Sequence, residues 1–136
     1  MGVLIDSSVL VAVERQGVFW DELLGRGAEL EEDEPVAMAA ITAAELLHGV
    51  NRLMGVAQAR ASMYVETLIA EIPMEPYDVE VARVHATLSA ALSSKGTPVG
   101  AHDLIIAATA VALGYDVATR DLRSFPKIEG LRVRRW

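Results

Sequence analysis

The sequence predicts an α/β protein, a three-layer α/β/α sandwich around a central parallel sheet, with residues 1–136 forming one domain. Short runs of Val, Leu, Ile and Ala without polar alternation indicate strands that are buried on both faces. Segments with helical apolar spacing separate these runs, which is typical of right-handed βαβ crossovers. The 136 residues are 52% hydrophobic and 23% charged, a composition that suits one globular core.

The elements of the first half follow from apolar runs and their stop signals. A strand is expected over residues 3–5, and Ser7 or Ser8 would cap a helix that ends at Gly17. The next elements are a short helix with one apolar face, formed by Val18, Phe19, Leu23 and Leu24, and then an acidic loop. The remaining elements of this half are a strand over 36–40, a helix from Thr42 to Leu53 and a helix over about 56–70.

The second half continues the alternation of strands and helices. A third strand is expected over 72–74, and Asp78 would cap a helix that reaches Leu92. After a loop over 95–100, an Ala-rich helix over 104–113 is apolar nearly all round and should be buried against the sheet. The last elements are a strand over 115–119, a turn at Arg120 and Asp121, and a terminal strand over 131–133.

Composition limits the kind of metal site that the chain can form. The sequence has no cysteine and three scattered histidines, so any bound metal would be held mainly by oxygen, which favours magnesium or manganese. No signal peptide and no apolar run long enough to span a membrane is recognisable, and the cytoplasm is the expected location.

Charge is unevenly distributed along the chain. The net charge is -7, yet residues 117–136 carry six basic and two acidic side chains, which leaves -11 on the remainder. This basic end could hold phosphates, or it could be a solubilising terminus. The arginines concerned are Arg120, Arg123, Arg132, Arg134 and Arg135.

Four acids are predicted to meet at one rim of the sheet. Asp6 and Asp121 come directly after strands, Glu45 lies in the first helical turn after another strand, and Asp103 lies in the first turn of the buried helix. Each has a local explanation: a helix N-cap, a capping box that begins at Thr42, a favourable helix-dipole position and a turn. These explanations do not account for four carboxylates together, because like charges repel unless a cation neutralises them. A divalent metal site is the economical hypothesis.

Four segments resemble the acidic motifs of PIN-domain ribonucleases in order and spacing, namely Ile5–Leu10, Thr42–Leu46, His102–Ala110 and Ala118–Asp121. The resemblance covers essentially the whole chain. The length of the chain is similar to that of the VapC toxins of bacterial toxin-antitoxin pairs. Ser7 stands where Thr is common in the family, and Asp121 where Asn also occurs. His102 is not a family ligand and is expected at the surface.

The resemblance implies an endoribonuclease that depends on one or two Mg²⁺ or Mn²⁺ ions. The four acids Asp6, Glu45, Asp103 and Asp121 would hold the metal, which would activate a water for attack on an RNA phosphodiester. The hydroxyls of Ser7, Ser8 and Thr119 could position a water or a phosphate oxygen. The resemblance also implies a homodimer and a cognate VapB-type antitoxin that inserts a segment over the acidic cleft, where an arginine would replace the metal charge.

Two other classes share the predicted architecture. A response-regulator receiver domain has rim acids, but it needs paired acids after the first strand and a Lys after the last, and here Ser7 and Ser8 follow Asp6. A non-catalytic acidic α/β binding module would keep the fold while the acids served as caps.

Overall fold

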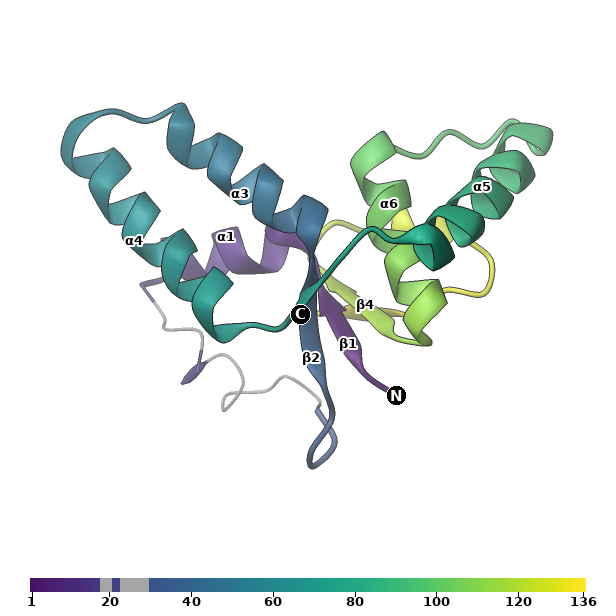
Figure 1. Ribbon diagram of the computed structural model, residues 1–136, viewed down its shortest axis with the longest axis horizontal. Coiled ribbons are helices and arrows are strands. Elements are labelled where there is room, and N and C mark those ends of the chain that lie inside the picture. The colour runs from purple at the N-terminus through teal and green to yellow at the C-terminus, as the bar shows by residue number, and fades with distance from the viewer. Residues whose placement is uncertain (18–20, 23–29) are drawn as a thin grey trace.

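The computed structural model describes residues 1–17, 21–22 and 30–136 (Figure 1). The predicted short helix with Val18, Phe19, Leu23 and Leu24 lies outside the described residues. The strands are β1 (Val3–Ile5), β2 (Val36–Ala39), β3 (Met74–Glu75), β4 (Asp116–Thr119) and β5 (Val133–Arg135). The helices are α1 (Ser7–Arg15), α3 (Ala40–Asn51), α4 (Gly55–Glu71), α5 (Val79–Ser94), α6 (Ala101–Leu113) and the short 3₁₀ helix η1 (Phe125–Lys127).

Strand β1 is the centre of the sheet. Among the described residues, five strands form one sheet in the order β3-β2-β1-β4-β5, and all the pairings are parallel. Val3 aligns with Val36 of β2, and Ile5 aligns with Ala118 of β4. All three residues of β1 are fully buried, as expected for a strand covered on both faces. The predicted central parallel sheet is therefore confirmed.

Two apolar clusters place the helices on opposite faces of the sheet. One cluster joins Leu4 of β1 to residues of α5, α6 and η1, and the other joins Ile5 to residues of α1, α3 and α4. Adjacent residues of a strand point to opposite faces, so β1 contributes to both clusters. Figure 1 shows the same division, with α1, α3 and α4 on one side of the sheet and α5 and α6 on the other. The three-layer sandwich is confirmed.

Several predicted boundaries are confirmed, and others shift by about two residues. The Asp78 side chain accepts a hydrogen bond from the Val81 amide at 2.9 Å and so caps α5 as predicted, and Gly114 ends α6 with φ of +70°. The third and last strands lie at Met74–Glu75 and Val133–Arg135, two residues beyond the predicted starts. Both are edge strands of two or three residues, whose ends a short apolar pattern defines poorly. Within the described ranges, no helix is both long and apolar enough to cross a bilayer.

The amino ends of the strands are tied together by Arg134. Its Nε donates to Asp116 Oδ2 at 2.7 Å, and its two terminal nitrogens donate to Glu34 at 3.0 and 2.5 Å. The Arg134 side chain is 17% exposed, whereas that of Arg132, 3.5 Å from the same Asp116 oxygen, is 79% exposed. The guanidinium of Arg134 thus clamps β5 to β4 and to the segment before β2. The Arg134 guanidinium is already bound by these two carboxylates, and its contact with RNA phosphates stays a prediction.

Arg134→Gln should lower the free energy of unfolding by about 1–3 kcal/mol, because it leaves two partly buried carboxylates without their cation. Arg132→Gln, on the exposed neighbour, should cost less than about 0.5 kcal/mol. The Arg134 hydrogen bonds lower the pKa of Glu34 below its ordinary 4.5, so this stabilisation is present above that value and is lost as the pH falls through the folded-state pKa. Urea unfolding of both variants at neutral and acidic pH tests this. Equal losses in the two variants at neutral pH would contradict it.

Candidate functional site

The site is centred on Asp6, the residue that links β1 to α1. Asp6 occupies the N-cap position of α1, but its side chain does not cap the helix. Its Oδ2 accepts hydrogen bonds from Ser8 Oγ at 2.7 Å and from Thr119 Oγ1 at 3.0 Å. The residue is only 4% exposed, so two hydroxyls replace part of the hydration that the carboxylate loses. The expectation that Ser7 or Ser8 is the cap is wrong, because Asp6 holds that position.

The two hydroxyls also connect Asp6 to the end of β4. Ser8 Oγ lies 3.2 Å from Thr119 Oγ1 and accepts a hydrogen bond from the Arg120 amide at 3.0 Å. Thr119 Oγ1 in turn accepts from the Asp121 amide at 3.0 Å. The predicted positions of Ser8 and Thr119 at the rim agree with this network, and their roles in any reaction stay predictions. Ser7 borders the site without a hydrogen bond of its side chain among the described residues.

Glu45 lies on α3, the helix that follows the neighbouring strand β2. The helix begins at Ala40, directly after β2, and its N-cap is Ala39, which offers no side-chain hydrogen bond. Thr42 is therefore inside the helix and fully buried, and the predicted capping box of Thr42 and Glu45 is wrong. Glu45 Oε1 is buried and has no hydrogen-bond partner among the described residues. Helix capping does not explain this carboxylate.

The environment of Glu45 disfavours its charged form. Burial raises the pKa of Glu45, and the negative charges of Asp6 and Asp103 raise it further. His102 acts in the opposite direction, with its Nδ1 3.8 Å from Glu45 Oε2. His102 is at the surface, as expected, with 58% of its side chain exposed, yet it borders the acidic cluster.

Asp103 approaches from the other side of the sheet, in the first turn of α6. Burial raises the pKa of its carboxyl, the charges of Asp6 and Asp121 raise it further, and a hydrogen bond from the Ser124 side chain opposes the shift. Asp103 lies where the dipole of α6 favours a negative charge, as predicted. This dipole does not remove the repulsion from Asp6 and Asp121. Ser124 was not among the predicted residues, because no local sequence motif associates it with Asp103.

Asp121 is the exception in the cluster, since it has its own counter-ion. Arg123 donates to Asp121 Oδ1 from its amide at 3.0 Å and from Nε at 2.9 Å, and to Oδ2 from its terminal nitrogen at 2.7 Å. These hydrogen bonds lower the pKa of Asp121 to about 2. The hydrogen bond from the Arg123 amide to Asp121 Oδ1 closes an Asx turn, which confirms the predicted role of Asp121 as a turn former. The Arg123 side chain is 88% exposed, and its contact with RNA stays a prediction.

The four predicted acids share one electrostatic environment, but they do not form a finished ligand set. Asp6 perturbs both Glu45 and Asp103, and Asp103 is also perturbed by Asp121. No three acidic or imidazole groups of the described residues are grouped closely enough to hold one ion as they stand. The unpartnered buried Glu45 oxygen, the raised pKa values and the all-oxygen donors nevertheless fit a hard divalent cation.

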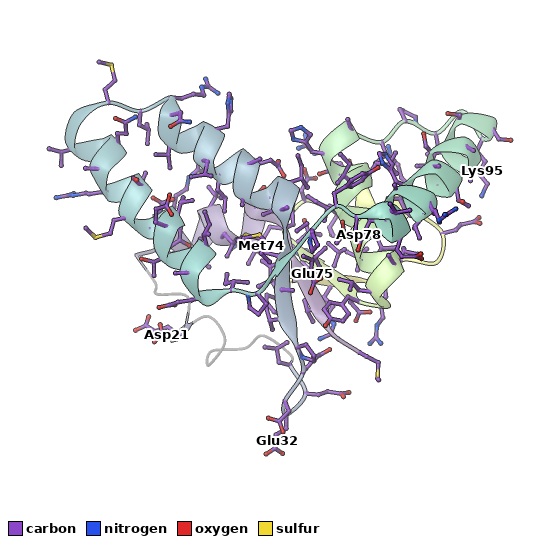
Figure 2. All side chains as sticks on the ribbon, viewed as in Figure 1. Asp21, Glu32, Met74, Glu75, Asp78 and Lys95 are labelled. Carbon is purple, nitrogen blue, oxygen red and sulfur yellow. The ribbon has the colours of Figure 1, made fainter. Side chains whose placement is uncertain are left out.

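Two hollows flank α1 beside these acids. One, of about 610 Å³, lies between α1, α3 and α4, is bordered by Glu45, and is otherwise lined largely by apolar side chains such as Leu46, Val50 and Val65. The other, of about 480 Å³, is bordered by Ser8, Ala12, Arg15 and Arg120. Figure 2 shows Glu32 at the far end of the molecule from the starts of α3 and α6, so Glu32 is not part of this site.

Comparison with known proteins identifies relatives over nearly the whole chain. The PIN domain family model matches residues 3–131. The tRNA(fMet)-specific endonuclease VapC of Salmonella typhimurium is 35% identical over 101 residues, which is 74% of this chain and 75% of the relative. Ribonuclease VapC1 of Rickettsia felis is 28% identical over 134 residues, 98% of this chain and 95% of the relative. In the crystal structure of DNA-bound VapBC from Salmonella typhimurium, a chain superposes with a TM-score of 0.84 at 28% identity, covering 100% of this chain and 98% of that one.

Replacing Glu45 by Gln should stabilise the protein in EDTA at neutral pH. The folded state raises the pKa of Glu45 above 4.5, so its ionised form destabilises the fold above that pH, and Gln removes the charge while keeping the shape. The advantage should disappear below pH 4.5, where Glu45 is neutral in both states. Melting curves at the two pH values test this, with Glu66→Gln on the exposed face of α4 as the control. A lower melting temperature for Glu45→Gln at neutral pH would show that the carboxylate stabilises the fold.

Proposed function

The chain belongs to the PIN-domain family, and from this we propose that it is an endoribonuclease toxin of the VapC type, with Mg²⁺ or Mn²⁺ held by Asp6, Glu45, Asp103 and Asp121. The observation that carries the proposal is the electrostatic coupling of Asp6 with Glu45 and Asp103, which come from three separate segments of the chain. The ribonuclease names of the relatives support the reaction class. The choice of metal is supported by the oxygen-only donors.

A divalent cation bound there would polarise the phosphodiester and activate a water for attack on phosphorus. The protein's own contribution is to hold its carboxylates in place before the substrate arrives. Hydrogen bonds from the Ser8 and Thr119 hydroxyls hold the Asp6 carboxylate. Arg123 orients Asp121 through both carboxylate oxygens. Carboxylates that already lie near one another leave less rearrangement to be made when a metal and the substrate bind.

The proposed protein partner is a VapB-type antitoxin. Solved neighbours with this fold include VapBC complexes from Salmonella typhimurium and Mycobacterium tuberculosis, at 28% and 31% identity to this chain. An arginine of the antitoxin could satisfy the unpartnered Glu45 oxygen and its neighbours, which would displace the metal charge. Co-expression with the product of the adjacent gene tests this partner, and sedimentation of the purified chain tests the homodimer that the family resemblance implies. The cytoplasm, where RNA is available, is the proposed location.

The alternative classes have less support. The family match argues against a receiver domain. In a non-catalytic binding module the acids would serve as caps, yet the side chains of Asp6 and Glu45 do not cap their helices. A cleavage assay separates the binding module from the nuclease.

The purified chain, freed of any partner, should cleave single-stranded RNA with Mg²⁺ or Mn²⁺ and stop in EDTA. Asp6→Asn keeps the shape but removes the central charge, and should slow cleavage by roughly a hundredfold or more, equivalent to a few kcal/mol of transition-state stabilisation. Asp6→Asn purified in the same way also controls for contaminating nuclease, and Glu66→Gln, which removes an exposed carboxylate from α4, should cut at the wild-type rate. Cleavage that persists in EDTA, or an Asp6→Asn variant that cuts at the wild-type rate, would refute the site.

Glu45→Gln separates the metal role from the folding role of this side chain. A hard cation needs negative charge, so Gln should bind Mn²⁺ more weakly and gain less melting temperature from added Mn²⁺ than the wild type does. The rate of RNA cleavage by Glu45→Gln should fall together with its Mn²⁺ affinity. Calorimetric titration with Mn²⁺ gives a readout that does not depend on activity. Wild-type Mn²⁺ affinity in Glu45→Gln would remove Glu45 from the ligand set.

A further inference from the structure

We propose that the hollow bordered by Arg15 and Arg120 binds a backbone phosphate of the RNA next to the phosphodiester that is cut. The inference rests on the proposed nuclease function and assigns a substrate subsite to one side of α1. The hollow has a volume of about 480 Å³ and shares Ser7, Val11 and Arg15 with the hollow that contains Glu45. It is therefore adjacent to the acidic site.

The position of Arg120 relative to the acids is fixed by hydrogen bonds. The Arg120 amide donates to Ser8 Oγ at 3.0 Å, and Ser8 donates to Asp6 at 2.7 Å. Arg15 lies seven residues after Ser8 on α1, which is two helical turns or roughly 10 Å along the axis. Ala12, between them on the same face, leaves the floor of the hollow open. The two guanidinium groups therefore border a path that leads from Asp6 along α1.

The two arginines differ from the other cations of the rim and the tail. Arg123 is paired with Asp121, and Arg134 with Glu34 and Asp116. In the part of the chain that the structure describes, neither Arg15 nor Arg120 forms an ion pair. None of the described residues that line this hollow is acidic. The positive charges of Arg15 and Arg120 are therefore available to an anion from outside the chain.

The electrostatics of the acidic site create a need for such cations. Even with Arg123 beside Asp121, four ionised carboxylates carry more negative charge than one divalent ion neutralises, so an approaching RNA phosphate meets net repulsion unless other cations lie beside the site. Arg15 and Arg120 supply that charge on one side. The neighbouring hollow, which Arg15 also borders, contains Glu14 and Glu45 among apolar side chains, and these two carboxylates do not suit a polyanion. The contrast favours RNA on the arginine side.

Binding of a fluorescent single-stranded oligouridylate tests the subsite, with the Asp6→Asn background and EDTA preventing cleavage. Arg15→Gln and Arg120→Gln should each weaken binding at low salt and reduce the slope of log affinity against log salt concentration by about 0.7, and the double variant by about 1.4. Arg60→Gln, on an exposed position of α4, should reduce the slope less than either. Arg15→Lys with Arg120→Lys retains the charge and should restore most of the slope.

Each outcome separates the subsite from the proposed nuclease. An unchanged slope in the double Gln variant would overturn the subsite, while RNA cleavage by the wild type would still support the nuclease. A second outcome would also overturn the subsite. If the double Gln variant keeps the wild-type salt dependence of RNA binding but no longer binds the antitoxin encoded by the adjacent gene, the hollow is a binding site for that protein. The expected slopes without metal-dependent cleavage by the wild type would refute the nuclease and retain the phosphate site. Equal melting temperatures of the variants verify that they fold.

Discussion

The buried carboxylate of Asp6 is the constraint on which the site depends. A carboxylate that is 4% exposed loses most of its hydration, and the hydroxyls of Ser8 and Thr119 replace only part of it. Its charge therefore acts on its neighbours through a medium that screens it poorly, which explains why it raises the pKa values of both Glu45 and Asp103. The same hydroxyls tie the end of β1 to the end of β4, so the surroundings of Asp6 depend on the pairing of these two strands.

The sheet order determines which segments can supply the other groups. Because β1 lies between β2 and β4, its carboxyl end is flanked by the start of α3 on one side and by Thr119 on the other. The two helical acids come from helices on opposite faces, Glu45 from α3 and Asp103 from α6 (Figure 1). No single element contains the cluster. A change in the register of β1 would separate all of these groups at once.

The sequence was informative where a local pattern has one structural meaning. The buried strands, the Asp78 cap and the Gly114 helix end follow from apolar runs, hydrogen-bond capacity and backbone freedom. The capping box failed because β2 passes into α3 without a linker, and this junction has no separate sequence signal. The partners of Asp103 and Arg134 were also unpredictable from the sequence. Ser124, Glu34 and Asp116 lie far from them in the chain or outside any motif, and only the fold brings them together.

The fold also sorts the positive charge of an acidic chain. At the amino ends of the strands, Arg134 forms ion pairs with Glu34 and Asp116 and stabilises the sheet. At the carboxyl ends, Arg123 is paired with one rim acid, while Arg15 and Arg120 border a hollow without acidic lining among the described residues. A net charge of -7 is therefore compatible with RNA binding, because the potential that a polyanion meets over a few ångströms is set by nearby groups and salt screens the distant ones. The partners that each arginine has in the fold, and not the number of arginines in the basic tail, determine which of them is available to RNA.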